Sequence, residues 1–351
     1  MWIRKEKRAA PETGRACLIL LGGMLVLVII MATGMGYMRI SAGDVIRIIF
    51  YGLSGNHGLI AGINKVFPYV VWDVRLPRVL TAAVVGTGLS LAGVVFQGIL
   101  LNPLADPYTL GISAGAAFGA SIALLLDIGS LGIYSVPLFA FAGAVATLFA
   151  VMALSTSGGT ISSNNLILSG IIVAAILSAG ISFIKYVADE QVSIIIFWLM
   201  GSFGSKTWVD VFITFSFVFI GFIICIFFAR DLNIMSLGDR SASSLGINPN
   251  RTRITLLVTA SMITAVCVSV SGIIGFVGLI IPHLMRFIVG SDSRGLVPAS
   301  ALAGAILLLS ADTVTRALLP AEIPIGVLTA LIGGPFFCYI FKKRQTAVQS
   351  G

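Results

Sequence analysis

The side chains best suited to chemistry in this sequence are three arginines, and their chemistry would be electrostatic recognition. Arg75 and Arg78 flank Pro77 directly before a long apolar segment, and Arg316 stands near the end of another. If all three are exposed on one weakly charged face, they would attract and orient an acidic partner. Solvated arginines at helix ends would have the same spacing. The spacing therefore leaves both interpretations open.

Asp312 is the acidic residue whose position inside an apolar segment most invites a functional interpretation, because ionisable groups within a membrane are rare and often functional. It stands four residues before Arg316. This spacing places two side chains on one face of a helix. We expect Asp312 and Arg316 to form an ion pair.

Motifs for catalysis and for binding nucleotides or metals are missing from the sequence. It contains no G-x-x-x-x-G-K-[ST] phosphate loop, no H-E-x-x-H and no Ser/His/Asp set or paired carboxylates. Its four cysteines form no C-x-x-C pair, so neither a disulfide framework nor a zinc site is indicated. We expect a chain without enzymatic activity and without a metal or cofactor of its own.

The polar stretch 236–253 (SLGDRSASSLGINPNRTR) lies between apolar segments and has the pattern of a short helix. Ser236 with Asp239 matches a capping box, and Gly246 suits a left-handed C-terminal cap. Asn248-Pro249 has the pattern of the start of the next helix. The expected small apolar face consists of Leu237, Ala242 and Leu245. A helix that cannot span a bilayer is expected to contact another molecule.

The elements that must position these residues are membrane helices. The chain has 351 residues, of which 58% are hydrophobic and 10% charged, and its mean hydropathy is +1.06. Soluble domains carry about 25% charged residues. We predict an all-α, polytopic membrane protein with about ten spans of roughly 20 apolar residues each. The predicted spans are 16–36, 79–101, 109–126, 134–154, 165–187, 209–229, 254–271, 273–289, 298–319 and 325–341.

The distribution of basic residues predicts the orientation. The first span is preceded by Arg4, Lys5, Lys7, Arg8 and Arg15, and the last is followed by Lys342, Lys343 and Arg344. Because Lys and Arg accumulate in cytoplasmic loops, both termini and the stretch 236–253 are predicted to be cytoplasmic. The net charge of +8 then reflects topology, and we expect no binding of nucleic acid. The first apolar run is too long for a cleaved signal peptide and lacks a small-residue cleavage site.

No linker divides the chain, so residues 1–351 are predicted to form one membrane domain. Short helices are expected at 42–51 and 193–200, within two pieces predicted to lie outside. Two inner turns, Asn102–Pro107 and Gly158–Asn165, have the composition of gates and equally of ordinary turns. Gly111, Gly115 and Gly119, and likewise Gly272, Gly275 and Gly278, are expected to let helices approach closely.

Six blocks of the sequence resemble the permease subunits of the FecCD type, which belong to ABC importers for iron–siderophore complexes, haem and vitamin B12. In chain order the blocks are RLPRVLTAAVVG (75–86), GVVFQGILLNPLADPYTLGISAGAAFGA (93–120), FWLMGSFG (197–204), SLGDRSASSLGIN (236–248), GFVGLIIPHLMR (275–286) and LLSADTVTRALLPAEIPIGVLTALIGGPFF (308–337). The resemblance implies the architecture of a type II ABC importer permease in the bacterial cytoplasmic (inner) membrane. It also implies a second permease copy, expected to be identical, two cytoplasmic ABC ATPase subunits that bind ATP and Mg, and an extracytoplasmic substrate-binding protein.

The resemblance also implies a role for each group of residues. The ATPase-coupling segment would consist of Leu237, Gly238, Asp239, Arg240, Ala242, Leu245 and Gly246. Arg75, Arg78 and Arg316 would dock the binding protein, and Asn102, Leu104, Ser163 and Asn164 would form the cytoplasmic gate. Arg240 stands where the family commonly has an acidic residue.

The expected function is the import of a metal chelate by alternating access, with iron(III)-siderophore as the first expectation and haem or cobalamin as alternatives. An ion-coupled secondary transporter is the rival of another class. That class requires intramembrane carboxylates, and in this sequence Asp312 comes closest to one. A membrane enzyme would require a nucleophile and base that the sequence does not offer.

Overall fold

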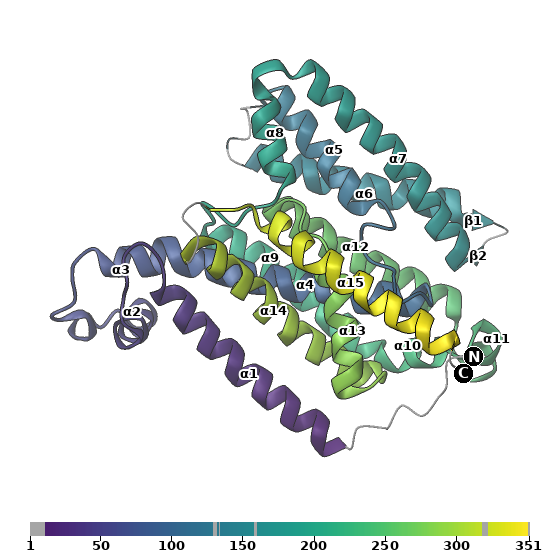
Figure 1. The fold of residues 1–351 in the computed structure, drawn as a ribbon, viewed down its shortest axis with the longest axis horizontal. Coiled ribbons are helices and arrows are strands. Elements are labelled where there is room, and N and C mark those ends of the chain that lie inside the picture. Colours follow the sequence, from purple (N-terminus) through teal and green to yellow (C-terminus); the bar gives the residue numbers. More distant parts are fainter. Residues whose placement is uncertain (1–10, 129–131, 133, 158–159, 318–321, 350–351) are drawn as a thin grey trace.

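The computed structural model describes residues 11–128, 132, 134–157, 160–317 and 322–349, and these form an almost wholly helical protein (Figure 1). The basic residues Arg4, Lys5, Lys7 and Arg8 and the glycines Gly158 and Gly159 lie outside the described residues. The α-helices are α1 (Pro11–Gly34), α2 (Ala42–Ser54), α3 (Phe67–Tyr69), α4 (Leu76–Ile99), α5 (Ile112–Leu125), α6 (Ser135–Ser155), α7 (Ser163–Val187), α8 (Val192–Leu199), α9 (Trp208–Phe227), α10 (Ala229–Met235), α11 (Asp239–Ser244), α12 (Pro249–Ser271), α13 (Val277–Val289), α14 (Ser293–Ala317) and α15 (Ile325–Gln349). Short η segments are η1 (His57–Ile60), η2 (Val70–Arg75) and η4 (Asp189–Gln191), and the strands β1 (Thr156–Ser157) and β2 (Thr160–Ile161) pair antiparallel.

The predicted spans coincide with apolar helices. Seven helical segments of the described chain are long and apolar enough to cross a membrane; they contain α1, α4, α6, α7, α9, α12 and α14. Three shorter apolar helices, Ile112–Leu125, Val277–Val289 and Ile325–Tyr339, occupy the other predicted positions. The all-α prediction is confirmed. The predicted short helices at 42–51 and 193–200 are present as α2 and α8.

The boundary between the predicted spans 254–271 and 273–289 is a stretch of irregular backbone rather than a polar loop. Gly272 and Phe276 have φ values of 70° and 68°, which end α12 and delay the start of α13. The Ser202 amide donates to the Ser271 carbonyl at 2.8 Å, and a Cβ on Gly201 would lie 2.8 Å from the Ile273 carbonyl oxygen. Irregular backbone inside a membrane protein persists where other parts of the chain cover it.

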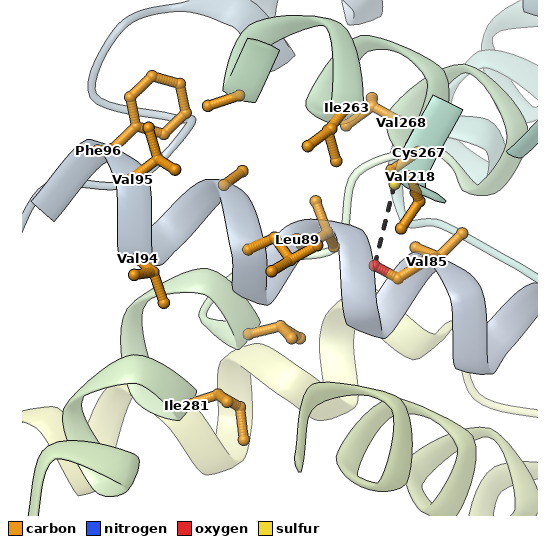
Figure 2. Packing of buried hydrophobic residues seen from close by; sticks show 14 of the residues in the cluster. Val85, Leu89, Val94, Val95, Phe96, Val218, Ile263, Cys267, Val268 and Ile281 are labelled. Atoms are coloured by element: carbon orange, nitrogen blue, oxygen red, sulfur yellow. Dashed lines mark hydrogen bonds between the residues drawn. The ribbon is translucent and has the colours of Figure 1, made fainter. Parts of the chain in front are cut away.

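The core is built around α4, whose side chains pack against α9, α12 and α13. Figure 2 shows buried residues of this cluster, among them Leu89, Phe96 and Ile263, and the Cys267 thiol lies 3.9 Å from the Val85 carbonyl oxygen. A Cβ on Gly93 would lie 1.8 Å from the Gly278 carbonyl oxygen. The backbones of α4 and α13 therefore touch, which explains why a small residue is needed there.

The predicted glycine ridge also brings helix backbones close together. Added Cβ atoms on Gly115 and Gly119 would lie 2.1 Å from the Thr147 hydroxyl and 2.1 Å from the Phe139 carbonyl oxygen, both on α6. Close backbone approach replaces the hydrophobic drive that lipid cannot provide between helices. Gly115 and Gly119 therefore form a packing surface between α5 and α6, whereas Gly111, which precedes α5, lies against Gly170 and Ala174 of α7.

The connecting elements gather at two ends of the helical bundle. At one end lie α2 and α3, and at the other lie α11, the β1–β2 hairpin and the last turns of α15 (Figure 1). We refer to these as the α2 end and the α11 end. Arg75, Arg78 and Arg316 belong to the α2 end, whereas the stretch 236–253 and the inner turns belong to the α11 end.

Candidate functional site

Helix α11 is a six-residue helix in the predicted polar stretch, but its N-terminal cap is not the predicted one. Gly238 caps it with a φ of 95°, and no side chain caps its amides. The Ser236 hydroxyl instead donates to the Asn233 carbonyl at 2.6 Å. The predicted Ser236–Asp239 capping box is wrong, because α10 continues to Met235 and its last turn engages Ser236.

The C-terminal signals of this stretch are confirmed. Gly246 has a φ of 83°, a left-handed conformation that favours glycine. Asn248 caps α12 by accepting a hydrogen bond from the Arg251 amide at 3.0 Å, and Pro249 is the first residue of that helix. The stretch is thus a defined helix held between two others.

The three residues of the predicted apolar face differ in burial. Ala242 is fully buried, whereas the Leu237 and Leu245 side chains are each 61% exposed. Gly238 adopts positive φ between them and Arg240 is exposed. The two exposed leucines flank α11, and each offers an apolar surface that the described chain does not cover. Such a surface suits contact with another protein.

Sequence reasoning treated Arg253 as an ordinary basic residue of this loop, but it is buried. Its guanidinium donates to the Asp239 carboxylate at 2.8 Å and to the Ile161 carbonyl at 3.0 Å. It stands in the second turn of α12, and no pattern in the sequence distinguishes it from an exposed basic residue. Arg251 on the same helix is exposed.

The structure brings the two inner turns together, and their role as a gate stays a prediction. The Ser163 hydroxyl at the start of α7 donates to the Ile99 carbonyl at the end of α4 at 3.0 Å. Asn102 accepts a hydrogen bond from the Leu104 amide at 3.0 Å, which closes the turn after α4. Leu104 and Asn164 are exposed, so parts of both turns are accessible at the α11 end.

Asp106 completes the turn that follows α4. Its carboxylate accepts hydrogen bonds from the Tyr108 and Thr109 amides, each at 3.0 Å. Burial raises the pKa of this carboxyl from 3.8 to about 6, and the two amide hydrogen bonds oppose that rise. The turn thus holds a carboxyl group that titrates above its usual range.

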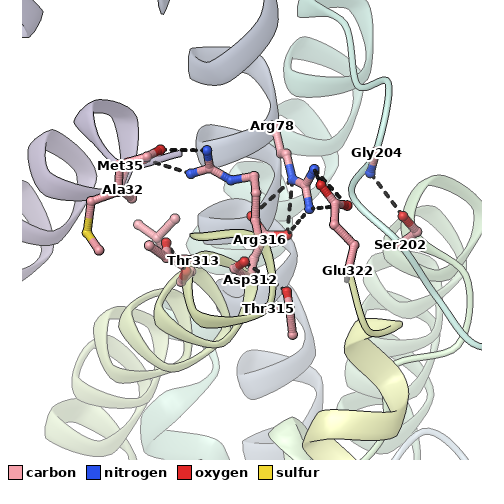
Figure 3. Close-up of polar contacts among 11 residues, drawn as sticks. Ala32, Met35, Arg78, Ser202, Gly204, Asp312, Thr313, Thr315, Arg316 and Glu322 are labelled. Carbon is pink, nitrogen blue, oxygen red and sulfur yellow. Dashed lines mark hydrogen bonds and ion pairs between the residues drawn. The ribbon is translucent and has the colours of Figure 1, made fainter. Parts of the chain in front are cut away.

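Arg78 is the centre of an ion-pair network at the α2 end (Figure 3). It donates to Asp312 at 2.9 Å and to Glu322 at 3.2 Å. The predicted pairing of Asp312 with Arg316 is wrong. Arg316 instead donates to the Met35 and Ala32 carbonyls, both at 2.7 Å.

Arg75 and Arg316 bind the C-terminal end of α1. Arg75 donates to the Thr33, Gly34 and Met38 carbonyls at distances from 2.6 to 3.1 Å. The last carbonyls of a helix have no partner within it, and buried ones require a donor from elsewhere.

The arginines are accordingly not the three exposed cations expected from the sequence. Arg75 is 7% exposed, the Arg78 side chain is 14% exposed, and Arg316 is half-buried. Each guanidinium already has acceptors within the chain. Docking of an acidic partner by these residues stays a prediction.

An open apolar groove of about 550 Å³ lies between the end of α8, the irregular segment that joins α12 to α13, and α15. Its lining residues are Leu199, Met200, Ile273, Gly275, Gly326, Val327, Ala330, Leu331 and Pro335. The groove offers large apolar contacts and few polar groups. Among the described residues, no group of three or more His, Cys, Asp or Glu side chains is placed to hold a metal ion.

Comparison with known proteins relates these features to one family. The family model of the FecCD transport family matches residues 24–343. The cobalamin import system permease protein of Halobacterium salinarum is 41% identical over 284 residues, covering 81% of this chain and 76% of that protein. The Fe(3+)-citrate import system permease protein of Bacillus subtilis is 37% identical over 343 residues, covering 97% of each chain.

The fold is also similar to that of a solved transporter of this kind. A solved structure described as an inward-facing conformation of a putative metal-chelate type ABC transporter superposes with a TM-score of 0.81 at 35% identity. The superposition covers 93% of this chain and 98% of the other.

Proposed function

Because this chain belongs to the FecCD transport family and is a permease subunit of an ABC importer for metal chelates, we propose that it carries an iron(III)-siderophore complex across the membrane. In this family ATP is hydrolysed on separate subunits, so the chain is a transport subunit and not an enzyme. The proposal extends to the cargo, the assembly and the orientation. ATP and Mg would be bound by the partner ATPase.

The observation that carries the proposed assembly is the exposed apolar surface of α11. Leu237 and Leu245, which flank α11, are each 61% exposed, in a chain whose sequence lacks a phosphate loop. We assign this surface, with Gly238, Asp239, Arg240, Ala242 and Gly246, to contact with one ABC ATPase subunit. Two permease copies would then engage two ATPases.

The proposed orientation follows from the same contact. If α11 meets an ATPase, the α11 end and both termini lie in the cytoplasm, in agreement with the basic residues near the chain ends. The α2 end then faces outward in the bacterial inner membrane. There Arg78 and Arg316, with Arg75 behind them, would receive acidic side chains of a substrate-binding protein.

The proposed mechanism is alternating access. ATP would bind one arrangement of the paired ATPases more tightly, and the permease arrangement that fits it would become favoured. The inner turns at Asn102, Leu104, Ser163 and Asn164 would open and close the cytoplasmic side. The apolar groove between α8, the segment that joins α12 to α13, and α15 is suited to form a weakly polar wall of the path.

A cobalamin importer is the second candidate for the cargo, because a relative named for cobalamin import is 41% identical. The ion-driven carrier has less support. Asp312, the carboxylate that such a mechanism would use, is 1% exposed and engaged by Arg78 at 2.9 Å. A carboxylate that carries protons or ions must change partners during transport.

The assembly is tested by purifying the tagged permease from membranes that also contain its ATPase. Leu245→Asp should reduce the recovered ATPase by about tenfold or more, because it places a charge in an apolar contact. Leu53→Asp is the matched control, since Leu53 is 74% exposed on α2 at the opposite end. Equal recovery with both variants would refute the assignment of α11.

The cargo is tested by uptake into proteoliposomes that contain the complex and its binding protein. The compounds to compare are radiolabelled iron(III) complexes of hydroxamate and catecholate siderophores, iron(III) citrate, haemin and cyanocobalamin. We expect ATP-dependent uptake of an iron(III)-siderophore complex. Uptake of cyanocobalamin alone would support the second candidate, and uptake driven by an ion gradient without ATP would overturn the proposal.

A further inference from the structure

Arg253 is an arginine buried at the α11 end, where a solvated side chain would be the ordinary arrangement. It is 5% exposed in the second turn of α12, while Arg251 on the same helix is exposed. Burying a guanidinium is costly unless its donors are paired. The partners of Arg253 therefore indicate what its burial achieves.

Those partners belong to two segments that are far apart in the sequence. One terminal nitrogen donates to the Asp239 carboxylate on α11 at 2.8 Å, and the other donates to the Ile161 carbonyl on β2 at 3.0 Å. A guanidinium is a rigid planar fork, so its two terminal nitrogens cannot move independently. A displacement of Asp239 that moves the guanidinium would therefore also shift the hydrogen bond to the Ile161 carbonyl.

The attachment of β2 to α12 is reinforced at the same residue. The Ile161 amide donates to the Asn250 side chain at 3.3 Å, so both backbone groups of Ile161 are bound by α12. Two residues further on, the Ser163 hydroxyl donates to the Ile99 carbonyl at 3.0 Å. Polar contacts thus connect α11 through Arg253 to Ile161, and the backbone from Ile161 to Ser163 joins them to the contact at the end of α4, where the turn at Asn102 begins.

We propose that Arg253 is the positioning residue that transmits movement of α11 to the inner turns. This rests on the proposed function, in which α11 contacts an ATPase. The Asp239 side chain is 57% exposed, so an ATPase that moves α11 can also reach the acceptor of Arg253. Arg253 would thus act through Asp239 and Ile161, as a positioning residue.

The first test measures uptake per ATP hydrolysed in the reconstituted complex, with ATPase subunits, binding protein and whichever compound of the panel above the wild type transports. Arg253→Gln removes the charge, and Arg253→Lys keeps the charge but lacks the fork. We expect each to lower uptake per ATP by about 2- to 30-fold. Arg251→Gln is the matched control and should leave the ratio unchanged.

The second test measures the movement itself. Spin labels at Ser243→Cys on α11 and Asn165→Cys on α7 report the distance between the two elements, after Cys17 and Cys338 are replaced by serine. With the complex in nanodiscs and both labels carried by one of its two permease copies, adding ATP and vanadate should shift α11 and α7 together in the wild type, leaving the distance between the labels narrow and unchanged. In Arg253→Gln the same addition should change or broaden that distance.

The tests distinguish the link from a purely structural role. Asp239→Ala and Arg253→Gln should reduce uptake per ATP non-additively, because they break the same contact. Melting temperatures of the variants identify any that fail to fold, and Arg253→Lys then carries the test. Unchanged uptake per ATP, or an unchanged distance distribution in both Arg253 variants, would overturn the link. Failure of the wild-type chain to bind any ATPase would instead overturn the proposed function on which the link rests.

Discussion

The Arg78–Asp312 ion pair allows a sharp test of how charge is stabilised in this fold. Asp312 is 1% exposed and accepts three hydrogen bonds from Arg78, at 2.9, 3.1 and 3.2 Å. Arg78 also pairs with Glu322, whose side chain is 56% exposed. One guanidinium thus pairs with a buried carboxylate and with an exposed one. The two ion pairs should therefore contribute very differently to the free energy of unfolding.

The expected magnitudes follow from burial. Arg78→Met leaves the Asp312 carboxylate buried without its cation, which should cost about 3–5 kcal/mol. Glu322→Gln removes an exposed pair, which should cost at most about 1 kcal/mol. The double variant Arg78→Met/Asp312→Leu removes the buried charge altogether, and it should recover most of the loss because an apolar pair can replace a buried ion pair.

The assay is unfolding in detergent micelles with an increasing fraction of SDS, followed by tryptophan fluorescence. Trp72 and Trp208 are suitable reporters, because their rings pack against each other near the α2 end, with ring centroids 5.1 Å apart. The ranking by burial would be refuted if Glu322→Gln destabilised the protein as much as Arg78→Met. A double variant no more stable than Arg78→Met would refute the role of the buried carboxylate.

Two further predictions concern packing and pH. Gly93→Ala should destabilise the protein by about 3 kcal/mol in the same assay, because the new Cβ would lie 1.8 Å from the Gly278 carbonyl oxygen and force α4 away from α13. Gly295→Ala, which meets nothing within 4 Å, should change stability by less than about 1 kcal/mol, and equal effects would contradict the close approach. For Asp106, the folded protein holds the proton more tightly than the unfolded chain, so the free energy of unfolding should fall as the pH rises from 3.8 to about 6 and stay constant above that. Asp106→Asn keeps a side-chain oxygen that accepts hydrogen bonds but cannot ionise, so it should abolish this pH dependence. At neutral pH the variant should be more stable than the wild type by on the order of 3 kcal/mol. A variant that retained the wild-type pH profile would show that another group titrates.

The sequence by itself determined that this is an all-α membrane protein and where its apolar helices lie. Lipid offers no hydrogen bonds to the backbone, so a span of an all-α protein consists mostly of apolar helix, which satisfies its own backbone groups. That requirement is local and can be recognised over about 20 residues. The extramembrane helix at 236–253, the cap at Asn248 and the positive φ of Gly246 are equally local, and the structure contains each of them.

The tertiary structure alone decided which charged and polar groups meet. Spacing on one helix predicted that Asp312 would pair with Arg316. Instead, the Asp312 carboxylate pairs with Arg78, which is 234 residues away in the chain. Arg316 binds carbonyls at the end of α1 instead, because buried helix ends need donors and α14 passes close enough to supply one. The burial of Arg253 has the same origin, since Ile161 approaches α12 only once α6, α7 and α12 have packed. Charge partners depend on contacts between distant segments, and these arise only from the packing of the whole bundle.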